Sequence, residues 1–334
     1  MTRPVATRPV DPADPEAFAE WFAVVDASTS GRWPGRAGWQ PDELRAPALD
    51  PHGALRTVLL GAGNPMVGAG MVELPRHDNR HLAQVTVEVH PAARRRGVGT
   101  ELLAACERVA IDDGRRIVWG WDEQRVPVTD GPTFAQARGY ALVLENVRRE
   151  LSLPMDPHQL RTLEAAALLG STGYEVVTFS ARWPEEWVED RAYFGRLMST
   201  EIPLGDWAGQ EETWDRDRVR RQERLVDRMG RELMVSVARS QKSGRPVAFT
   251  ELSVSRSVPE IAYQWDTLVL SEHRGHRLSL LVKLANLRLL GQVSPSTTVV
   301  VTWNAEANGP MIAVNDALGC QVVSVGRTWQ KTLA

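Results

Sequence analysis

Three consecutive arginines followed by two closely spaced glycines are the residues of this chain whose types and spacing best suit chemistry. The run reads Arg94, Arg95, Arg96, Gly97, Val98, Gly99 and Thr100, and it follows a valine-rich segment that ends at His90. Glycine lets a ligand approach bare backbone, and arginine supplies charge and hydrogen bonds for phosphate oxygens. A helix that begins at about Gly97 would direct its first N–H groups at the same place. The run therefore predicts a site for a pyrophosphate or a 3′-phosphate.

The elements that must position this run can be read from hydrophobic periodicity. Residues 82–90 alternate and are rich in valine, which predicts a strand, and 115–121 predict a short buried strand. Between them, five apolar residues fall on one helical face: Val98, Leu102, Cys106, Val109 and Ala110. We therefore expect strand, basic turn, helix and strand in succession, followed by a helix around Phe134.

The same pattern recurs 180 residues later in the chain. Residues 85–103 resemble residues 266–284, and an offset of 180 relates matching positions both inside and outside these segments. The related pairs are Val87 and Thr267, Val89 and Val269, Arg94 and Arg274, Val67 and Val247, and Gly139 and Gly319. Such a shared offset indicates two copies of one fold unit.

Length and order of elements agree with two units. A chain of 334 residues suits two domains of about 150 residues each. We expect the order β-β-β-α-β-α-β in each unit, which is a mixed α/β arrangement. The predicted boundaries are a first domain over 1–153, a linker over 154–172 and a second domain over 173–334.

Composition excludes several classes of function. The net charge is -3 with 43% hydrophobic residues, so neither nucleic acid nor an anionic membrane is an expected partner. No apolar run approaches the length of a membrane span, and the first ten residues lack the apolar core of a secretory signal. Cys106 and Cys320 lie in apolar segments, which indicates core residues and a reduced, cytoplasmic setting. Only three of the 39 basic residues are lysines, which indicates a GC-rich genome such as that of an actinobacterium.

The strand, the R-x-x-G-x-G turn and the helix resemble the acyl-CoA-binding motif of the GCN5-related N-acetyltransferases, the GNAT family. Residues 133–140 and 303–320 resemble the helix-to-strand segment that follows in that fold, once in each copy. The resemblance covers nearly the whole chain and is closest to actinobacterial two-domain members of the mycothiol synthase-like type. It implies two tandem domains, each with a mostly antiparallel central sheet, flanking helices and a splayed strand pair.

The resemblance also implies a cofactor site for acetyl-CoA in the first copy, and no metal. The edge at Val87 and Val89 should pair with the pantetheine arm, and the Val89 N–H should polarise the thioester carbonyl. The turn should hold the pyrophosphate, and Trp121 should end the next strand where the sheet splays. The expected cofactor-binding residues are Val87, Val89, Arg94, Arg95, Arg96, Gly97, Val98, Gly99, Thr100, Trp121 and Phe134.

Catalytic residues are less well defined by the pattern. A general base should deprotonate the acceptor amine, and Glu88 and Glu73 are the candidates on the two neighbouring strands. Exposure on an alternating strand is an equally good interpretation of Glu88. The family's frequent acid is a tyrosine four residues before a glycine, and here that position holds Ala135 in the first copy and Asn315 in the second.

The second copy departs from the motif at its glycines. Arg277 and Ser279 stand where the first copy has Gly97 and Gly99. A side chain at Arg277 would lie where a phosphate should meet bare backbone. We therefore expect the first copy to bind acyl-CoA and the second to shape the acceptor pocket.

Two features of the second half have alternative interpretations. The acidic and aromatic run at 205–218 could hold a cationic amine, but a solvated helix face is the more common explanation. Trp183 and Trp187 are four residues apart, which favours packing in the core.

These patterns favour an N-acyltransferase that moves an acetyl or other acyl group from acyl-CoA to a primary amine of a small molecule by direct attack in a ternary complex. Two alternatives stay open. One is a non-catalytic protein that binds acyl-CoA or another small molecule, and the other is activity in the second copy. The identity of the acceptor and the oligomeric state are not encoded in these patterns.

Overall fold

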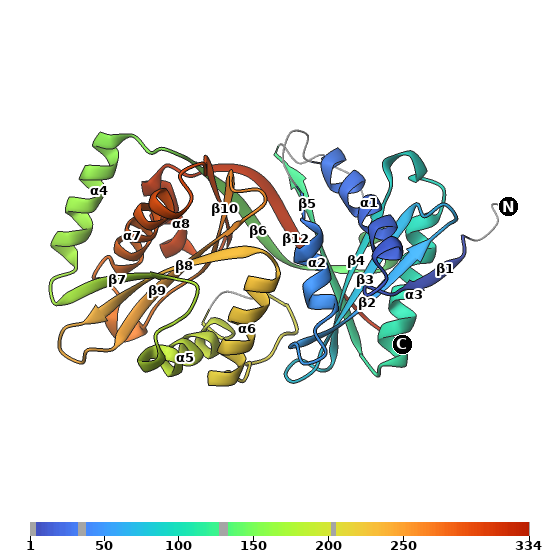
Figure 1. Ribbon diagram of the computed structural model, residues 1–334, viewed down its shortest axis with the longest axis horizontal. Coiled ribbons are helices and arrows are strands. Elements are labelled where there is room, and N and C mark those ends of the chain that lie inside the picture. The colour runs from blue at the N-terminus through green and yellow to red at the C-terminus, as the bar shows by residue number, and fades with distance from the viewer. Residues whose placement is uncertain (1–4, 33–37, 127–132, 202–204, 334) are drawn as a thin grey trace.

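One continuous sheet of twelve strands runs through both halves of the described chain (Figure 1). The computed structural model describes residues 5–32, 38–126, 133–201 and 205–333. The strands are β1 (Thr7–Val10), β2 (Leu55–Ala62), β3 (Gly68–Pro75), β4 (Leu82–Val89), β5 (Ile117–Arg125), β6 (Ala141–Ser152), β7 (Tyr174–Ser180), β8 (Arg231–Ser240), β9 (Pro246–Ser255), β10 (Ile261–Val269), β11 (Val299–Ala305) and β12 (Gln321–Thr332). The helices are α1 (Pro15–Arg32), α2 (Pro41–Ala48), α3 (Val98–Asp112), α4 (Pro157–Gly170), α5 (Val188–Met198), α6 (Arg216–Arg228), α7 (Leu278–Val293) and α8 (Gly309–Leu318).

The repeat predicted from the sequence is present element by element. β4, α3 and β5 of the first half correspond to β10, α7 and β11 of the second, each displaced by about 180 residues. In both halves the two strands that flank the long helix run parallel and pair only over a short stretch, while the other pairings are antiparallel. The predicted fold class, a mixed α/β fold of two tandem units with splayed strand pairs, is confirmed.

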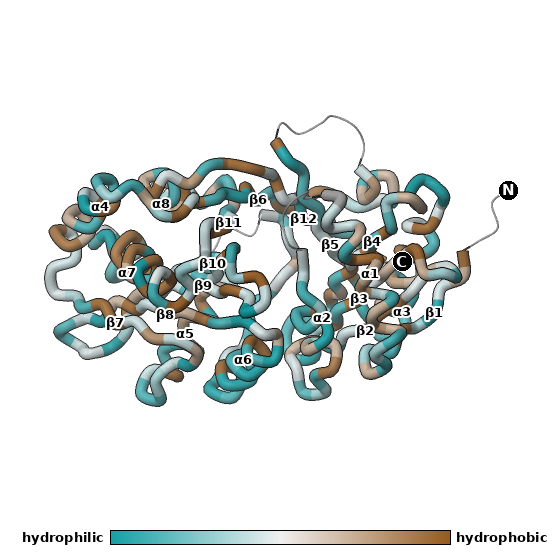
Figure 2. The backbone as a smooth tube through the Cα atoms, turned by 45° about the horizontal axis from the view of Figure 1, so that its top comes forward, coloured by the Kyte–Doolittle hydropathy of each residue, from teal (hydrophilic) through white to brown (hydrophobic). Residues whose placement is uncertain are grey.

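The two units exchange their last strands. The sheet order is β1-β2-β3-β4-β5-β12-β6-β11-β10-β9-β8-β7. β12 pairs with β5 from Thr332 opposite Ile117 to Ser324 opposite Arg125, and β6 pairs with β11 on one side and β12 on the other. Figure 2 shows β6 and β12 running beside each other between the two halves. The final strand of each half therefore completes the sheet of the other.

The core of the first half explains why β3 is rich in glycine. On one face of β3, a Cβ at Gly68 or Gly70 would lie 2.9 Å from the side chain of Val98 or Cys106 of α3. On the other face, Ala69 packs with the buried side chains of α1. The small residues let α3 lie close against the sheet, so the start of this helix is held at a fixed height above β4.

The structure differs from the sequence predictions around Phe134 and at the end of β5. Around Phe134 the structure has only a three-residue 3-10 helix at Gln136–Arg138, because Gly139 ends it in a left-handed conformation with φ of 81°. β5 continues to Arg125 and does not end at Trp121, because β12 pairs with it along its whole length. The predicted boundary at residue 153 falls between β6 and α4 and stays a prediction, since strand pairing crosses it.

Within the described residues, no helix combines the length and the apolar character that crossing a bilayer requires. Cys106 and Cys320 are both free thiols and both buried, which confirms the prediction that they are core residues. Trp183 and Trp187 likewise belong to the buried core of the second half, as predicted.

The strand exchange predicts that neither half folds alone. A fragment of residues 1–153 leaves one edge of β5 unpaired and gives β6 no neighbour, and exposed edges of this kind promote aggregation. We expect this fragment to aggregate or remain unfolded by circular dichroism and size-exclusion chromatography, and co-expression with residues 154–334 to recover a folded complex. A monomeric 1–153 fragment with a cooperative unfolding transition would contradict the expectation.

Candidate active site

β4 and β5 form an opening because the two strands pair over only a short stretch. Residues 82–84 pair with residues 117–119, and beyond them the two strands separate. Gly120 stands at the point of separation, where a Cβ would lie 2.6 Å from the carbonyl oxygen of Val85. Only glycine permits this approach, so Gly120 fixes the place where the opening begins.

Val87 and Val89 direct their N–H groups into this opening. The His90 N–H donates to the Val67 carbonyl at 2.9 Å, on the β3 side of the strand. Backbone groups alternate in direction along a strand, so the N–H groups of Val89 and Val87 point toward β5. β5 has already separated from β4 at this level, and the two N–H groups are therefore placed to meet a ligand.

The turn after β4 leads into α3 through a left-handed glycine. Gly97 has φ of 85°, and a Cβ built on it would meet nothing within 4 Å. The helical hydrogen bonds begin with the Thr100 N–H, which donates to the Gly97 carbonyl at 3.0 Å. The N–H groups of Val98 and Gly99 precede that bond and lie at the positive end of the helix. The turn has the geometry of an anion site that bare backbone can approach.

Arg94 is turned away from this anion site. Its Nε donates to the Val89 carbonyl at 3.2 Å, and its Nη2 donates to Ser28 Oγ of α1 at 3.0 Å. The Ser28 hydroxyl in turn donates to the Glu88 carboxylate at 2.5 Å. Arg94 thus ties the turn to β4 and α1, a contact that motif spacing does not reveal.

The other predicted cofactor residues surround the start of α3. Arg95 and Arg96 are exposed at the turn. A Cβ at Gly99 would lie 3.6 Å from the ring of Phe134, and the Arg138 guanidinium lies 5.6 Å from the centre of that ring. Phe134 therefore forms a wall beside the first turn of α3, where a ligand on that turn would contact it.

The far wall of the opening is β5, whose other edge pairs with β12 of the second half. Trp121 is 46% exposed and pairs with Thr328 of β12. Trp119 lies two residues away on the same face of β5, and its ring meets the edge of Trp207 at 5.7 Å. The strand exchange thus supports the β5 wall of the opening with residues beyond 200.

Glu88 and Glu73 lie on the same face of the sheet but in different places. Glu88 is opposite Ala69, beside the opening, whereas Glu73 is opposite Gln84, four residues further along β3. That register separates their backbones by roughly 13 Å, so the two carboxylates cannot act on one proton. Burial raises the pKa of Glu73 to about 7. The structure leaves both roles as predictions.

The corresponding turn of the second half is exposed, but Arg277 places a side chain at the start of α7. Arg277 begins α7 in the left-handed region with φ of 54°, the place that glycine takes in the first half. Its side chain packs on the end of α4, where a Cβ at Gly170 would lie 3.0 Å from Arg277 Cγ and Cδ. Tyr174 Oη lies 2.9 Å from His273 Nδ1 in the same turn. The start of α7 therefore carries a side chain and contacts with α4 and β7, whereas the start of α3 presents bare backbone at Gly97.

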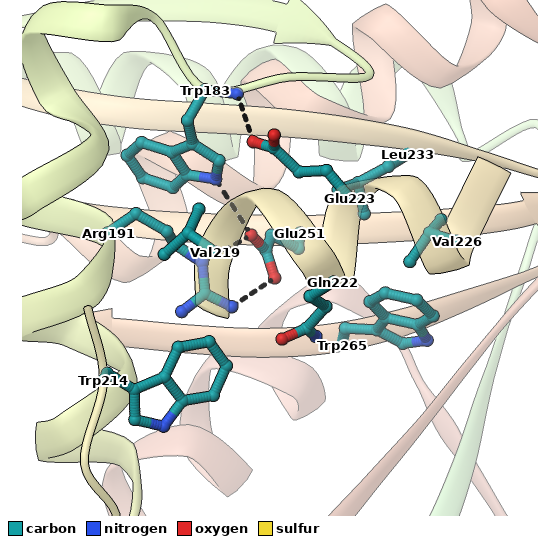
Figure 3. A pocket seen from close by; sticks show the side chains of 10 residues that line it. All are labelled: Trp183, Arg191, Trp214, Val219, Gln222, Glu223, Val226, Leu233, Glu251 and Trp265. Carbon is teal, nitrogen blue, oxygen red and sulfur yellow. Dashed lines mark hydrogen bonds and ion pairs between the residues drawn. The ribbon is translucent and has the colours of Figure 1, made fainter. Parts of the chain in front are cut away.

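A small cavity of the second half lies between α5, α6 and the sheet (Figure 3). Arg191 donates to both oxygens of Glu251, at 3.0 and 3.2 Å, and Trp183 Nε1 donates to the same carboxylate at 3.1 Å. The Trp183 N–H donates to Glu223 at 2.9 Å. The charges in this cavity are paired with one another, which is typical of a structural network.

The acidic and aromatic run at 205–218 joins the two halves. Residues 205–215 are irregular and α6 begins at Arg216, so the expectation of a solvated helix face is wrong for most of the run. The Gln210 N–H donates to Asn79 of the first half at 2.7 Å. The ring of Trp214 already lies 5.1 Å from the guanidinium of Arg191 and 4.4 Å from that of Arg218, so it offers little to a second cation.

Comparison with known proteins agrees with this geometry. Residues 18–127 match the Acetyltransferase (GNAT) family. Over 215 residues the chain is 29% identical to a mycothiol acetyltransferase of Geodermatophilus obscurus, and the match spans 63% of this chain and 63% of that relative's length.

Two solved structures resemble the whole fold. A tandem GNAT protein from the clavulanic acid biosynthesis pathway has a TM-score of 0.78 and 25% identity, with 98% of both chains covered. A GCN5-related N-acetyltransferase from Sphaerobacter thermophilus has a TM-score of 0.65 at 17% identity, covering 98% of this chain and 95% of the other. Taken with the open phosphate turn and the splayed strands, these matches show a region over residues 18–127 that matches the GNAT family and a whole-chain fold similar to that of a tandem GNAT protein.

Proposed function

We propose that the first half of this chain transfers an acetyl or other acyl group from acyl-CoA to a primary amine of a small molecule. The observation that carries the proposal is the contrast between the two turns. The turn at Gly97 presents bare backbone at the start of α3, whereas Arg277 carries a side chain at the matching position of α7 and packs it against α4.

The residues of the first half fit an acyl-CoA. The first N–H groups of α3, with the exposed Arg95 and Arg96, suit a pyrophosphate, because several donors and positive charges converge there. The pantetheine arm would then follow the edge of β4 toward Val89. Phe134 and the wall formed by Trp121 would enclose it.

Attack by the amine would not require a covalent enzyme intermediate. The Val89 N–H is directed at the place where the thioester carbonyl would lie, and a donor there stabilises the negative charge that develops on that oxygen. The departing thiolate is a good leaving group. Tyr140, which follows Gly139, donates its hydroxyl to Glu107 at 2.9 Å, and burial raises the pKa of its phenol, so it is unsuited to act as an acid.

Glu88 and Glu73 are the proposed bases, and a different observation favours each of them. Glu88 lies beside the opening, in contact with Ser28 and through it with Arg94. Glu73 lies further from the opening along β3, but its raised pKa matches a base that works near neutral pH. A non-catalytic acyl-CoA-binding role is the second candidate, and it is favoured by Ala135, which stands where the family often has a tyrosine.

Acetyl-CoA binding should depend on Gly97 and not on every left-handed glycine near α3. We expect Gly97→Val to weaken binding at least about tenfold, because the side chain strains a left-handed residue and obstructs the approach to the α3 N-terminus. Isothermal titration calorimetry with acetyl-CoA measures both affinity and stoichiometry, and we expect one site per chain.

Gly114→Val is the matched control for this experiment. Gly114 also has a positive φ, of 74°, and open space around a Cβ, but it lies at the other end of α3. Gly114→Val should lower the free energy of unfolding about as much as Gly97→Val does, while acetyl-CoA binding stays unchanged. Two sites per chain, or equal loss in both variants, would contradict the assignment of the cofactor to the Gly97 turn. Thiol release with a panel of primary amines then separates an enzyme from a binding protein.

The raised pKa of Glu73 predicts how the free energy of unfolding changes with pH. The unfolded carboxyl ionises near its ordinary value while the folded one holds its proton to about pH 7, so the parent loses stability as pH rises from about 4.5 to 7. Glu73→Gln should remove that loss and be roughly 1–3 kcal/mol more stable than the parent at pH 8. Urea unfolding at pH 5 and pH 8 measures the difference.

The exposed Glu306 provides the control for this pH experiment. Glu306→Gln should leave the pH dependence of stability as it is in the parent. If Glu73 is also the base, Glu73→Gln should abolish the rise of the turnover rate through about pH 7. Parallel pH profiles of stability for Glu73→Gln and the parent would show that Glu73 is ionised throughout.

A further inference from the structure

Lys283 is a buried lysine in the interior of the second half. It lies on α7, is 4% exposed and faces a small cavity of ≈ 20 Å³ between α7, α8 and the sheet. The cavity is lined by Leu151, Gln264, Lys283, Leu287, Val300, Thr302, Asn315, Leu318 and Cys320. It lies on the α7 side of β10 and β11, where those two strands separate.

The matching positions of the first half hold different residues from those around Lys283. The residue 180 positions before Lys283 is Leu103, which is also buried, on the matching face of α3. The residue that matches Asn315 is Ala135, and the one that matches Asn286 is Cys106. The same interior is apolar in the first half and polar in the second, so the two units are built to surround different groups.

The hydrogen bonds of Lys283 leave it under-satisfied. Its Nζ has three N–H donors and makes one long bond, of 3.4 Å, to Asn315 Oδ1. Asn315 is held in that orientation because its Nδ2 donates to Asn304 Oδ1 at 2.5 Å. In the described parts of the chain, no Asp or Glu oxygen lies within 4.0 Å of Lys283 Nζ. A buried ammonium of this kind favours a ligand that brings negative charge.

We propose that this cavity is a binding site for a small carboxylate such as acetate, which accepts hydrogen bonds from Lys283 Nζ and the Thr302 hydroxyl. One cation suits a singly charged anion better than a phosphate. Leu151, Leu287 and Val300 form the rest of the wall and suit a short apolar tail. This site lies in the second half, apart from the proposed acyl-CoA site at Gly97 in the first half.

The charge on Lys283 is set by few neighbours. Burial lowers the pKa of its ammonium to about 8, and the nearby Cys320 acts in the opposite direction. Cys320 itself is influenced by Arg149 of β6 and Asp316 of α8, which pair with each other at 3.6 Å. Carboxylate affinity should therefore be highest below about pH 8 and fall above it, as the ammonium loses its proton.

Lys283→Met tests the site without the expectation of a misfolded protein. The folded state holds the Lys283 proton less tightly than the unfolded state, so the charge opposes folding below about pH 8. The variant should therefore unfold at a higher temperature than the parent at pH 6.5. The same change at Lys242, an exposed lysine of the second half, is the matched control.

Thermal unfolding in sodium acetate and in sodium chloride of equal ionic strength measures binding. At pH 6.5 we expect acetate to raise the Tm of the parent and of Lys242→Met by about 1–3 °C over chloride, and not that of Lys283→Met. The rise should shrink at pH 9.5. No rise in the parent, or an equal rise in all three proteins that marks an adventitious additive only, would overturn the proposal.

The scarcity of lysine provides a direct second measurement. The chain has three lysines, so ¹⁵N-labelling of lysine Nζ gives three side-chain resonances in the NMR spectrum. Acetate should raise the apparent pKa of Lys283 and leave that of Lys242 unchanged. An acetate-independent titration of Lys283 would overturn the proposal. Acetyl-CoA titration of Lys283→Met should match the parent, which keeps this test separate from the proposed acyltransferase activity.

Discussion

The pairing of β12 with β5 and of β6 with β11 is the constraint on which the rest of this molecule depends. Backbone hydrogen bonds of the sheet must be completed, and here each half can complete them only with a strand of the other. Two units that could have been independent domains therefore share a single sheet. The opening between β4 and β5 consequently has one wall, β5, that is held in the sheet by a strand of the other half, β12.

Buried charges reinforce this exchange at the centre of the sheet. Arg148 of β6 donates to Glu150 at 2.9 Å and lies 3.5 Å from Glu123 of β5, and Ser324 of β12 donates to Glu123 at 2.5 Å. All four residues are buried. Removing one member would leave an uncompensated charge in the interior, which commonly costs about 3–5 kcal/mol. The network therefore fixes which strands are neighbours, and in which register.

The same backbone turn occurs in both halves but has different surroundings in each. Gly97 and Arg277 adopt the same left-handed conformation at the start of α3 and α7, but one is open and the other is packed against Gly170. The interiors diverge in the same way, with Leu103 in one half and Lys283 in the other. A shared scaffold thus holds one site suited to a phosphate-bearing cofactor and one polar cavity of a different kind.

The sequence by itself determined the repeat, the strand-turn-helix succession and the resemblance to the GNAT family, because these follow from periodicity and from glycines at fixed spacing. It could also have located Gly120, since a glycine inside a strand signals close backbone approach. Only the tertiary structure decided that Arg94 ties the turn to Ser28, that Glu88 and Glu73 lie apart, and that β12 pairs with β5 along its whole length. These depend on contacts between residues distant in the chain, and local patterns do not encode which strand becomes the neighbour of which.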